Sequence, residues 1–109
     1  MRFHRTSEFT GGWFIGDFEP SLLRTKEFEV AVKEHPAGED WPEHYHAVAT
    51  EYNYLCSGEM VIGEDVIEVG DIFVIDPGES VKPHFYTDCV IVTIKVPSIP
   101  GDKYVVHKP

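Results

Sequence analysis

Short stretches of β-forming residues, separated by glycine, proline and aspartate about every eight to twelve residues, limit most strongly how this chain can fold. In Phe28–Lys33 and again in Val90–Val96, apolar side chains alternate with other residues at a period of two. This alternation is typical of a strand that buries one face, so we expect Phe28, Val30 and Val32 to face a core. The pattern as a whole predicts an all-β sandwich or barrel.

The connections fit the same architecture. Met60–Ile62 and Val66–Val69 flank Gly63-Glu64-Asp65, which predicts a hairpin with a short connection containing glycine. Pro20–Lys26 is the one stretch where we expect a helical turn. The sequence contains no internal repeat, and its length of 109 residues predicts one domain.

Charge and composition narrow the class of partner. The net charge is −10, from 19 acidic and 9 basic residues, and the basic residues are scattered. Such a surface repels polyanions, so we expect no nucleic-acid partner. A small ligand is a different case, because one cation in a pocket can reverse the local field.

The cysteines and the apolar runs predict a soluble cytoplasmic protein with no membrane partner. Cys56 and Cys89 form no CxxC pair and are too few for a disulfide scaffold, so we expect free thiols in a reducing compartment. The apolar runs, such as Ile72–Ile75, are too short to span a membrane, and residues 1–12 lack the apolar core of a signal peptide.

Two histidines and a glutamate form the strongest candidate site. His44 and His46 are two residues apart, so on a strand both imidazoles point to the same face. Glu51 lies at an odd offset, and it returns to that face only if the chain reverses or bulges across Ala47–Thr50. Two imidazoles and one carboxylate suit a divalent metal ion that keeps open positions for water or substrate.

With these residues in place, the sequence resembles the cupin superfamily. The first cupin motif requires five anchors, and all are present at the family spacing: Gly38, His44, His46, Glu51 and Gly58. The second motif is incomplete. Gly70 and Gly78 match it, whereas Asp76 replaces a proline, Val81 stands at the histidine and Phe85 at the asparagine.

The resemblance implies an antiparallel jelly-roll β-barrel of the small single-domain cupins. We expect the barrel over residues 28–96, an N-terminal segment over 1–27 and a C-terminal tail over 97–109. The aromatic N-terminal segment then packs on the barrel or across a homodimer interface, and a homodimer is the expected assembly.

The resemblance also implies which residues hold a metal inside the barrel. His44, His46 and Glu51 match the family ligands, and His84 completes the site only if the Glu79–Pro83 loop absorbs three extra residues. Iron, manganese, nickel and zinc all suit this donor set. The alternative is a metal-free cupin whose histidines hydrogen-bond a ligand or one another.

Around that site, Tyr52, Phe73 and Phe85 are expected in the core or in a pocket wall. Lys33 and Arg24 are the cations near the first barrel strands; a surface position is the usual one for such residues, although either could recognise an anionic substrate.

Three functions follow from this reading. The first is a metal-dependent cupin that acts on a small polar molecule, such as a sugar derivative or an organic acid, by oxygenation or isomerisation. The second is a non-catalytic module that binds or senses a small ligand such as a carbohydrate. The third is a metal-free epimerase or isomerase with His44 or His46 as general base. The fold alone does not rank them, and no enzyme class is assigned.

Overall fold

In the computed structural model, which describes residues 1–107, almost every regular element is a strand in an antiparallel ladder. One sheet has five strands in the order β1-β2-β9-β4-β7. Their bounds are Trp13–Ile15, Glu29–His35, Cys89–Val96, Thr50–Ser57 and Ile72–Ile75. The other ladders are β6-β5-β8 and β10-β3. These strands span Asp65–Ile67, Met60–Ile62, Pro83–Phe85, Tyr104–Val105 and His44–Tyr45.

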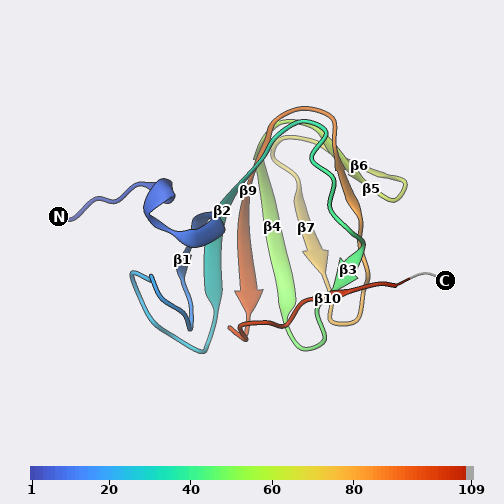
Figure 1. Cartoon of the computed structure of the whole chain (residues 1–109). Helices are drawn as coiled ribbons and strands as arrows, with labels where there is room; N and C mark the ends of the chain where they lie inside the picture. Colours follow the sequence, from blue (N-terminus) through green and yellow to red (C-terminus); the bar gives the residue numbers. More distant parts are fainter. Residues whose placement is uncertain (108–109) are drawn as a thin grey trace.

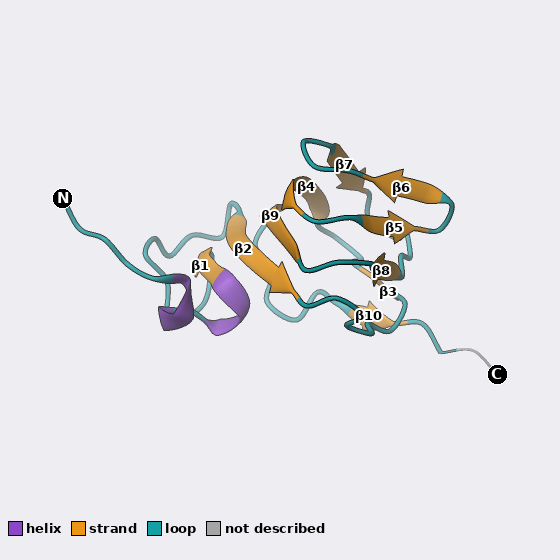
Figure 2. Cartoon of the chain, turned by 90° about the horizontal axis from the view of Figure 1, so that it is seen from above, coloured by secondary structure: helices purple, strands orange, loops and turns teal. Residues whose placement is uncertain are grey.

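The five-stranded sheet forms one layer and the two smaller ladders form the other (Figure 2). All strand pairs within the sheets are antiparallel. The apolar core lies between the two layers. It consists of Leu55, Met60, Ile67, Phe85, Cys89 and Ile91. The predicted all-β class and jelly-roll arrangement are confirmed.

The buried face of the long strands is the opposite of the one that the alternation predicted. On β2 the buried residues include Glu29, Ala31 and His35, whereas Val30 and Val32 are partly exposed. On β9, Thr93 and Lys95 are buried in the same phase, and Ile94 and Val96 are exposed. The expectation that Phe28, Val30 and Val32 face the core is therefore wrong, because polar side chains line the interior here and apolar ones cover the outside.

The β5–β6 hairpin is confirmed, with Ile62 opposite Asp65 and Gly63 at φ 60° in the connection. A helical turn over Pro20–Lys26 is wrong. Leu23 instead makes a parallel bridge to Ile15, so this stretch runs alongside β1. Two short 3-10 helices precede β1, at Thr6–Glu8 and Thr10–Gly12.

The N-terminal segment packs against the barrel of its own chain. Trp13 and Ile15 of β1 pair with Ala31 and Val30 of β2, at the edge of the five-stranded sheet (Figure 1). In the described part of the chain, no helix has the length and apolar character needed to cross a membrane.

The two glycines that bound the first motif have different surroundings. Gly58 has φ 94°, and a Cβ there would overlap the Asp88 carbonyl oxygen and lie 2.9 Å from the Cys89 Cα. Gly38 also has a positive φ, 76°, but a Cβ there would have nothing within 4 Å.

We therefore predict different costs for the same substitution. Gly38→Ala loses only backbone freedom at positive φ and destabilises the protein by about 1 kcal/mol. Gly58→Ala also forces β4 away from the Asp88–Cys89 backbone, so its cost is larger by about 1–3 kcal/mol. Urea unfolding measures both values, and equal values for the two variants would show that the close approach at Gly58 is not tight.

Candidate functional site

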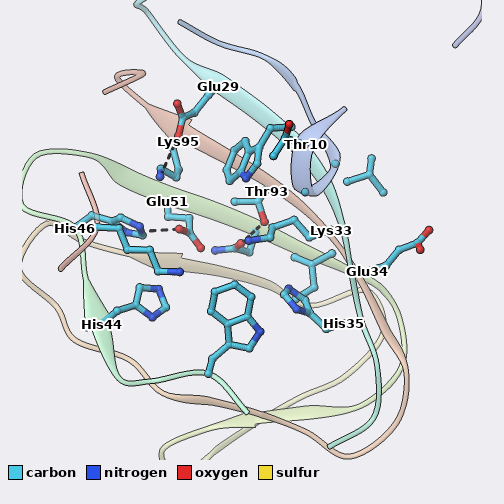
Figure 3. Close-up of a pocket in the computed structure, with 18 of the residues that line it drawn as sticks. Thr10, Glu29, Lys33, Glu34, His35, His44, His46, Glu51, Thr93 and Lys95 are labelled. Carbon is cyan, nitrogen blue, oxygen red and sulfur yellow. Dashed lines mark hydrogen bonds and ion pairs between the residues drawn. The ribbon is translucent and has the colours of Figure 1, made fainter. Parts of the chain in front are cut away.

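The interior of the barrel contains a cavity of about 940 Å³ that adjoins the apolar core cluster, since Met60, Phe85 and Ile91 of that cluster line it. The wall is formed by inward side chains of β2, β4 and β9, by the segment around Trp41 and His44, and by residues near both termini (Figure 3). Its charged and imidazole side chains come from different elements. They include Glu29, Lys33, His35, Glu51, Lys95 and Lys103.

The chain reversal that the sequence required is present. β3 ends at Tyr45 and β4 begins at Thr50, so residues 46–49 form the reversal. This loop returns Glu51 to the side of His46, with 3.6 Å between the His46 Nδ1 and the Glu51 Oε2 (Figure 3). The rings of His44 and His46 lie edge to face, with centroids 5.5 Å apart. Three of the predicted site residues are therefore neighbours in one cavity.

The two imidazoles have different hydrogen-bond environments. His44 Nδ1 lies 3.2 Å from the Pro42 carbonyl oxygen, which accepts a hydrogen bond from the Nδ1–H group and leaves Nε2 as the lone-pair nitrogen of the neutral ring. His46 is 4% exposed, and its Nδ1 has no hydrogen-bond partner among residues 1–107. A buried nitrogen without a partner is uncommon, and it marks a position where a ligand, an ion or a proton would be accommodated.

The structure does not bring His84 to this cavity. His84 lies on β8 opposite Val61, is exposed, and its ring contacts Tyr86 at a centroid distance of 4.8 Å. At the motif position of the fourth ligand, Val81 forms a bridge with His44 and lines the cavity.

Of the three aromatic residues expected in the core or the pocket wall, two lie at the cavity and one does not. Phe73 and Phe85 line the cavity. Tyr52 is 44% exposed and lies on the outer face of β4, because Glu51 and Asn53 on either side of it point inward.

Three lysines line the cavity: Lys33, for which a surface position was the usual expectation, and Lys95 and Lys103, which the sequence did not indicate as site residues. The Lys33 Nζ lies 5.1 Å from the Trp41 ring centroid and 5.5 Å from the Trp13 centroid. The Lys95 Nζ lies 5.2 Å from the Trp13 centroid, and the Lys103 Nζ lies 4.0 Å from the Trp41 centroid. Lys33 on β2 and Lys95 on β9 belong to the set of alternate residues that faces the interior. Had the sequence pattern been assigned with that set inside, it would have indicated both lysines. No signal in the sequence indicated Lys103.

Two polar groups beside the lysines also went unnoticed in the sequence. Thr93 Oγ1 donates a hydrogen bond of 2.8 Å to Asn53 Oδ1, and the buried Asn53 Nδ2 has no partner in the described part of the chain. His35 Nδ1 lies 2.7 Å from Glu39, which also accepts a hydrogen bond from the Trp41 indole. The Asn53 amide therefore offers a free donor to a ligand, whereas Glu39 is already used by the wall.

Burial and the lysine charges keep the site imidazoles neutral near pH 7. Burial lowers the pKa of His46, and the charge of Lys95 lowers it further against the opposing effect of Glu51. Burial likewise lowers the pKa of His44, with additional effects from Lys103 and Lys33. A neutral imidazole is able to accept a proton.

The residues present supply metal-type donors but are not arranged as a metal site. Among residues 1–107, no group of three or more His, Cys, Asp or Glu side chains is placed to hold an ion. Three lysine amines line the same cavity, and a divalent cation added to them would be repelled. As placed in this structure, His44, His46 and Glu51 therefore do not form a metal site. Metal binding by these three residues stays a prediction.

Comparison with known proteins identifies the architecture. The structure is similar to an uncharacterised protein with a double-stranded β-helix domain from Klebsiella pneumoniae, with TM-score 0.70, 19% identity and coverage of 98% of this chain and 93% of that one. The chain has the cupin fold. No family model and no curated protein matches the sequence.

Enzymes with other activities share this cupin fold. A DMSP lyase from Ruegeria pomeroyi has TM-score 0.72 and 17% identity, with coverage of 86% of this chain and 49% of the lyase. A sugar phosphate isomerase of the cupin superfamily from Silicibacter pomeroyi has TM-score 0.62 and 17% identity, with coverage of 75% and 58%. This chain thus spans about half the length of these two enzymes, and the likeness establishes the fold alone.

The loop that positions His46 in this cupin barrel is held by one carboxylate from the C-terminal segment. Asp102 is 3% exposed and accepts hydrogen bonds from the backbone N–H groups of Ala47, Val48 and Ala49 at 2.9, 3.1 and 2.9 Å. Burial raises the pKa of Asp102, but these three hydrogen bonds together lower it by more, so the net pKa lies below the ordinary value of 3.8.

We predict that Asp102→Ala lowers the free energy of unfolding by about 2–3 kcal/mol, since three backbone N–H donors lose a charged acceptor and the hydrogen bond from Ala49 is buried. Because the native pKa is depressed, this contribution is complete above the ordinary pKa of 3.8 and is lost as the pH falls through the native pKa. The difference in the free energy of unfolding between the wild type and Asp102→Ala, measured with urea, should therefore become smaller below about pH 4.

The exposed Asp65 on the β6 hairpin provides the matched control, and Asp65→Ala should change stability little at any pH. A difference for Asp102→Ala that does not depend on pH would show that its charge does not hold the loop.

Proposed function

We propose that this cupin barrel binds a small polar molecule in its cavity and moves a proton on it without a metal, as an isomerase or epimerase does. The observation that carries the proposal is the buried His46 imidazole, without a hydrogen-bond partner among the described residues, 3.6 Å from Glu51 in a cavity lined by lysines. A base, a carboxylate that stabilises its protonated form, and cations for the developing oxyanion are the parts that such chemistry requires.

In this mechanism His46 is the general base. Its neutral ring accepts a proton from a carbon next to a carbonyl group of the ligand, and the electron pair of the broken C–H bond moves to the carbonyl oxygen. Glu51 stabilises the imidazolium that forms, because the two groups are 3.6 Å apart in a partly desolvated site. Lys95, the lysine whose charge acts on His46, stabilises the enolate oxygen, and return of the proton to the neighbouring carbon or the opposite face completes the reaction.

A divalent ion held by His44, His46 and Glu51 is the second candidate. The observation in its favour is that these donors line one cavity and that His46 Nδ1 is unpaired among residues 1–107. Binding would need the side chains to converge further than they do here. The third candidate, a binding or sensing module without catalysis, uses the same cavity and differs only in leaving the ligand unchanged.

Deuterium uptake from D₂O separates the candidates, because it detects proton abstraction even when the product is unknown. Purified protein is incubated with a panel of hydroxy-ketones, aldoses and 2-oxo acids, and proton NMR follows exchange at the carbon next to the carbonyl. We expect exchange with at least one compound, a loss of about 10²-fold or more in His46→Ala and a smaller loss in Glu51→Gln.

His84→Ala, on the outer wall, is the matched control and should exchange at the wild-type rate. Chelator treatment should leave the rate unchanged, whereas loss on chelation and recovery with iron, manganese, nickel or zinc would favour the metal centre. Binding without exchange across the panel would favour the non-catalytic module.

We further propose a homodimer formed through the outer face of the five-stranded sheet. On β4, β7 and β9 of this face, exposed aromatic and aliphatic side chains adjoin one another: Tyr52 is paired with Val74 and Ile94, and Tyr54 with Ile72. Ile72 is 73% exposed, and Val96 extends the patch along β9. A continuous patch of this kind is typical of a surface that another protein covers, and its lack of charged side chains suits a second copy of the same patch.

The predicted dimer is tested by light scattering after size exclusion. Ile94→Glu places a carboxylate at the centre of the patch and should give a monomer, because the charge would be buried without a partner. Val66→Glu, on the exposed β6 hairpin, is the control and should leave a dimer. A monomeric wild type at micromolar concentration would contradict the proposal.

A further inference from the structure

The three cavity lysines do not have equivalent partners. Lys95 pairs with the buried Glu29, with 3.0 Å between Nζ and Oε1, and Glu29 also accepts a hydrogen bond of 2.8 Å from Ser98. Lys33 and Lys103 have no carboxylate oxygen within 4.0 Å of their amines among residues 1–107. Lys95 therefore has a carboxylate as a direct partner, whereas Lys33 and Lys103 do not.

The two amines without a direct carboxylate partner lie beside the same indole. Lys33 Nζ and Lys103 Nζ are 5.1 and 4.0 Å from the Trp41 centroid. The negative face of an indole attracts each ammonium but does not cancel the repulsion between the two. Burial lowers the pKa of Lys33 against the opposing charges of Glu51 and Glu39, and partial burial together with the charges of Lys33 and Lys95 lowers that of Lys103 against the charge of Glu51. The carboxylate of Glu51 therefore acts on both amines from a distance, but neither amine has the direct ion pair that a cation removed from water requires.

An unpaired amide donor completes the arrangement. The side chain of Asn53 is 4% exposed, lines the cavity, and keeps its Oδ1 engaged by Thr93 while Nδ2 has no partner in the described residues. Figure 3 shows Lys33 extending from β2 towards the side of the cavity where Thr93 and Glu51 lie. Two ammonium groups and one amide N–H group are all donors, and together they match an acceptor that carries negative charge.

We infer that the ligand of this cavity is a small organic anion whose oxyanion group, a carboxylate or a phosphate, binds to Lys33 and Lys103 beside Trp41. This inference rests on the proposed function, because it names the class of molecule on which His46 and Glu51 would act. The anion supplies the direct ion-pair partner that Lys33 and Lys103 lack, and the remainder of the molecule then extends towards the imidazole end. A chain with net charge −10 attracts no anion by its overall field, so this local group of lysines decides the specificity.

The two tryptophans make the binding measurable. Trp13 and Trp41 are the only tryptophans in the sequence, and both line the cavity beside the lysines, so the intrinsic indole fluorescence originates there. The probes are malonate for the carboxylate, inorganic phosphate for the phosphate, and glucose as a neutral polar molecule. All are titrated at equal ionic strength in sodium chloride.

We expect malonate or phosphate to change the fluorescence saturably, and the one that binds more tightly identifies the oxyanion. Lys33→Gln and Lys103→Gln should each weaken this binding at least about tenfold, since each removes a charge-assisted hydrogen bond. Lys82→Gln is the matched control, because Lys82 is exposed and lies 3.9 Å from Asp40 outside the cavity. It should bind as the wild type does.

Each variant is first checked by circular dichroism and thermal unfolding. If Lys33→Gln does not fold, Lys33→Arg and Lys103→Gln carry the test, and arginine should retain the binding that glutamine loses. Unchanged binding in both glutamine variants would overturn the inference. Binding of glucose but of neither anion would also overturn it and would leave the proposed function standing. No response to any probe, together with no deuterium exchange, would overturn both.

Discussion

The site in this barrel depends on the hydrogen bonds that Asp102 accepts from the loop between β3 and β4. The reversal over residues 46–49 decides whether Glu51 faces the histidines or solvent, and three consecutive N–H groups in it have no strand partner. One buried carboxylate satisfies all three. Because Asp102 belongs to the segment that continues into β10, and β10 pairs with β3, the same stretch of chain holds both the loop and the strand that leads into it.

The sequence predicted the architecture well because its turn residues and motif spacing are local signals. The strands, the β5–β6 hairpin and the return of Glu51 to His46 follow from period-two geometry and from the position of glycines. The sequence did not predict which face of each long strand is buried. Alternation separates two faces but does not say which lies inside, and here the usual rule fails because the interior holds Lys33 and Lys95 while Ile94 and Val96 face outwards.

The remaining site residues could not be predicted from spacing because their positions depend on contacts between distant segments. Lys103 reaches Trp41 only because β10 pairs with β3. His84 is a strand residue on the outer side of β8, and no pattern around it distinguished that position from a loop that enters the barrel. The cupin fold is shared by a lyase, an isomerase and an oxalate oxidase, so the chemistry of this chain has to be read from its own side chains.

The wall of the cavity nearest the N-terminus has a consequence for how a ligand enters and leaves. Trp13, which lies beside two of the lysines, is on β1, a strand of three residues that pairs with β2 on one side and on the other with the irregular stretch around Leu23. β4 and β9 pair along most of their eight residues. Short edge strands separate at a smaller free energy than central ones, so we expect this wall to open first and to set the residence time of whatever occupies the barrel.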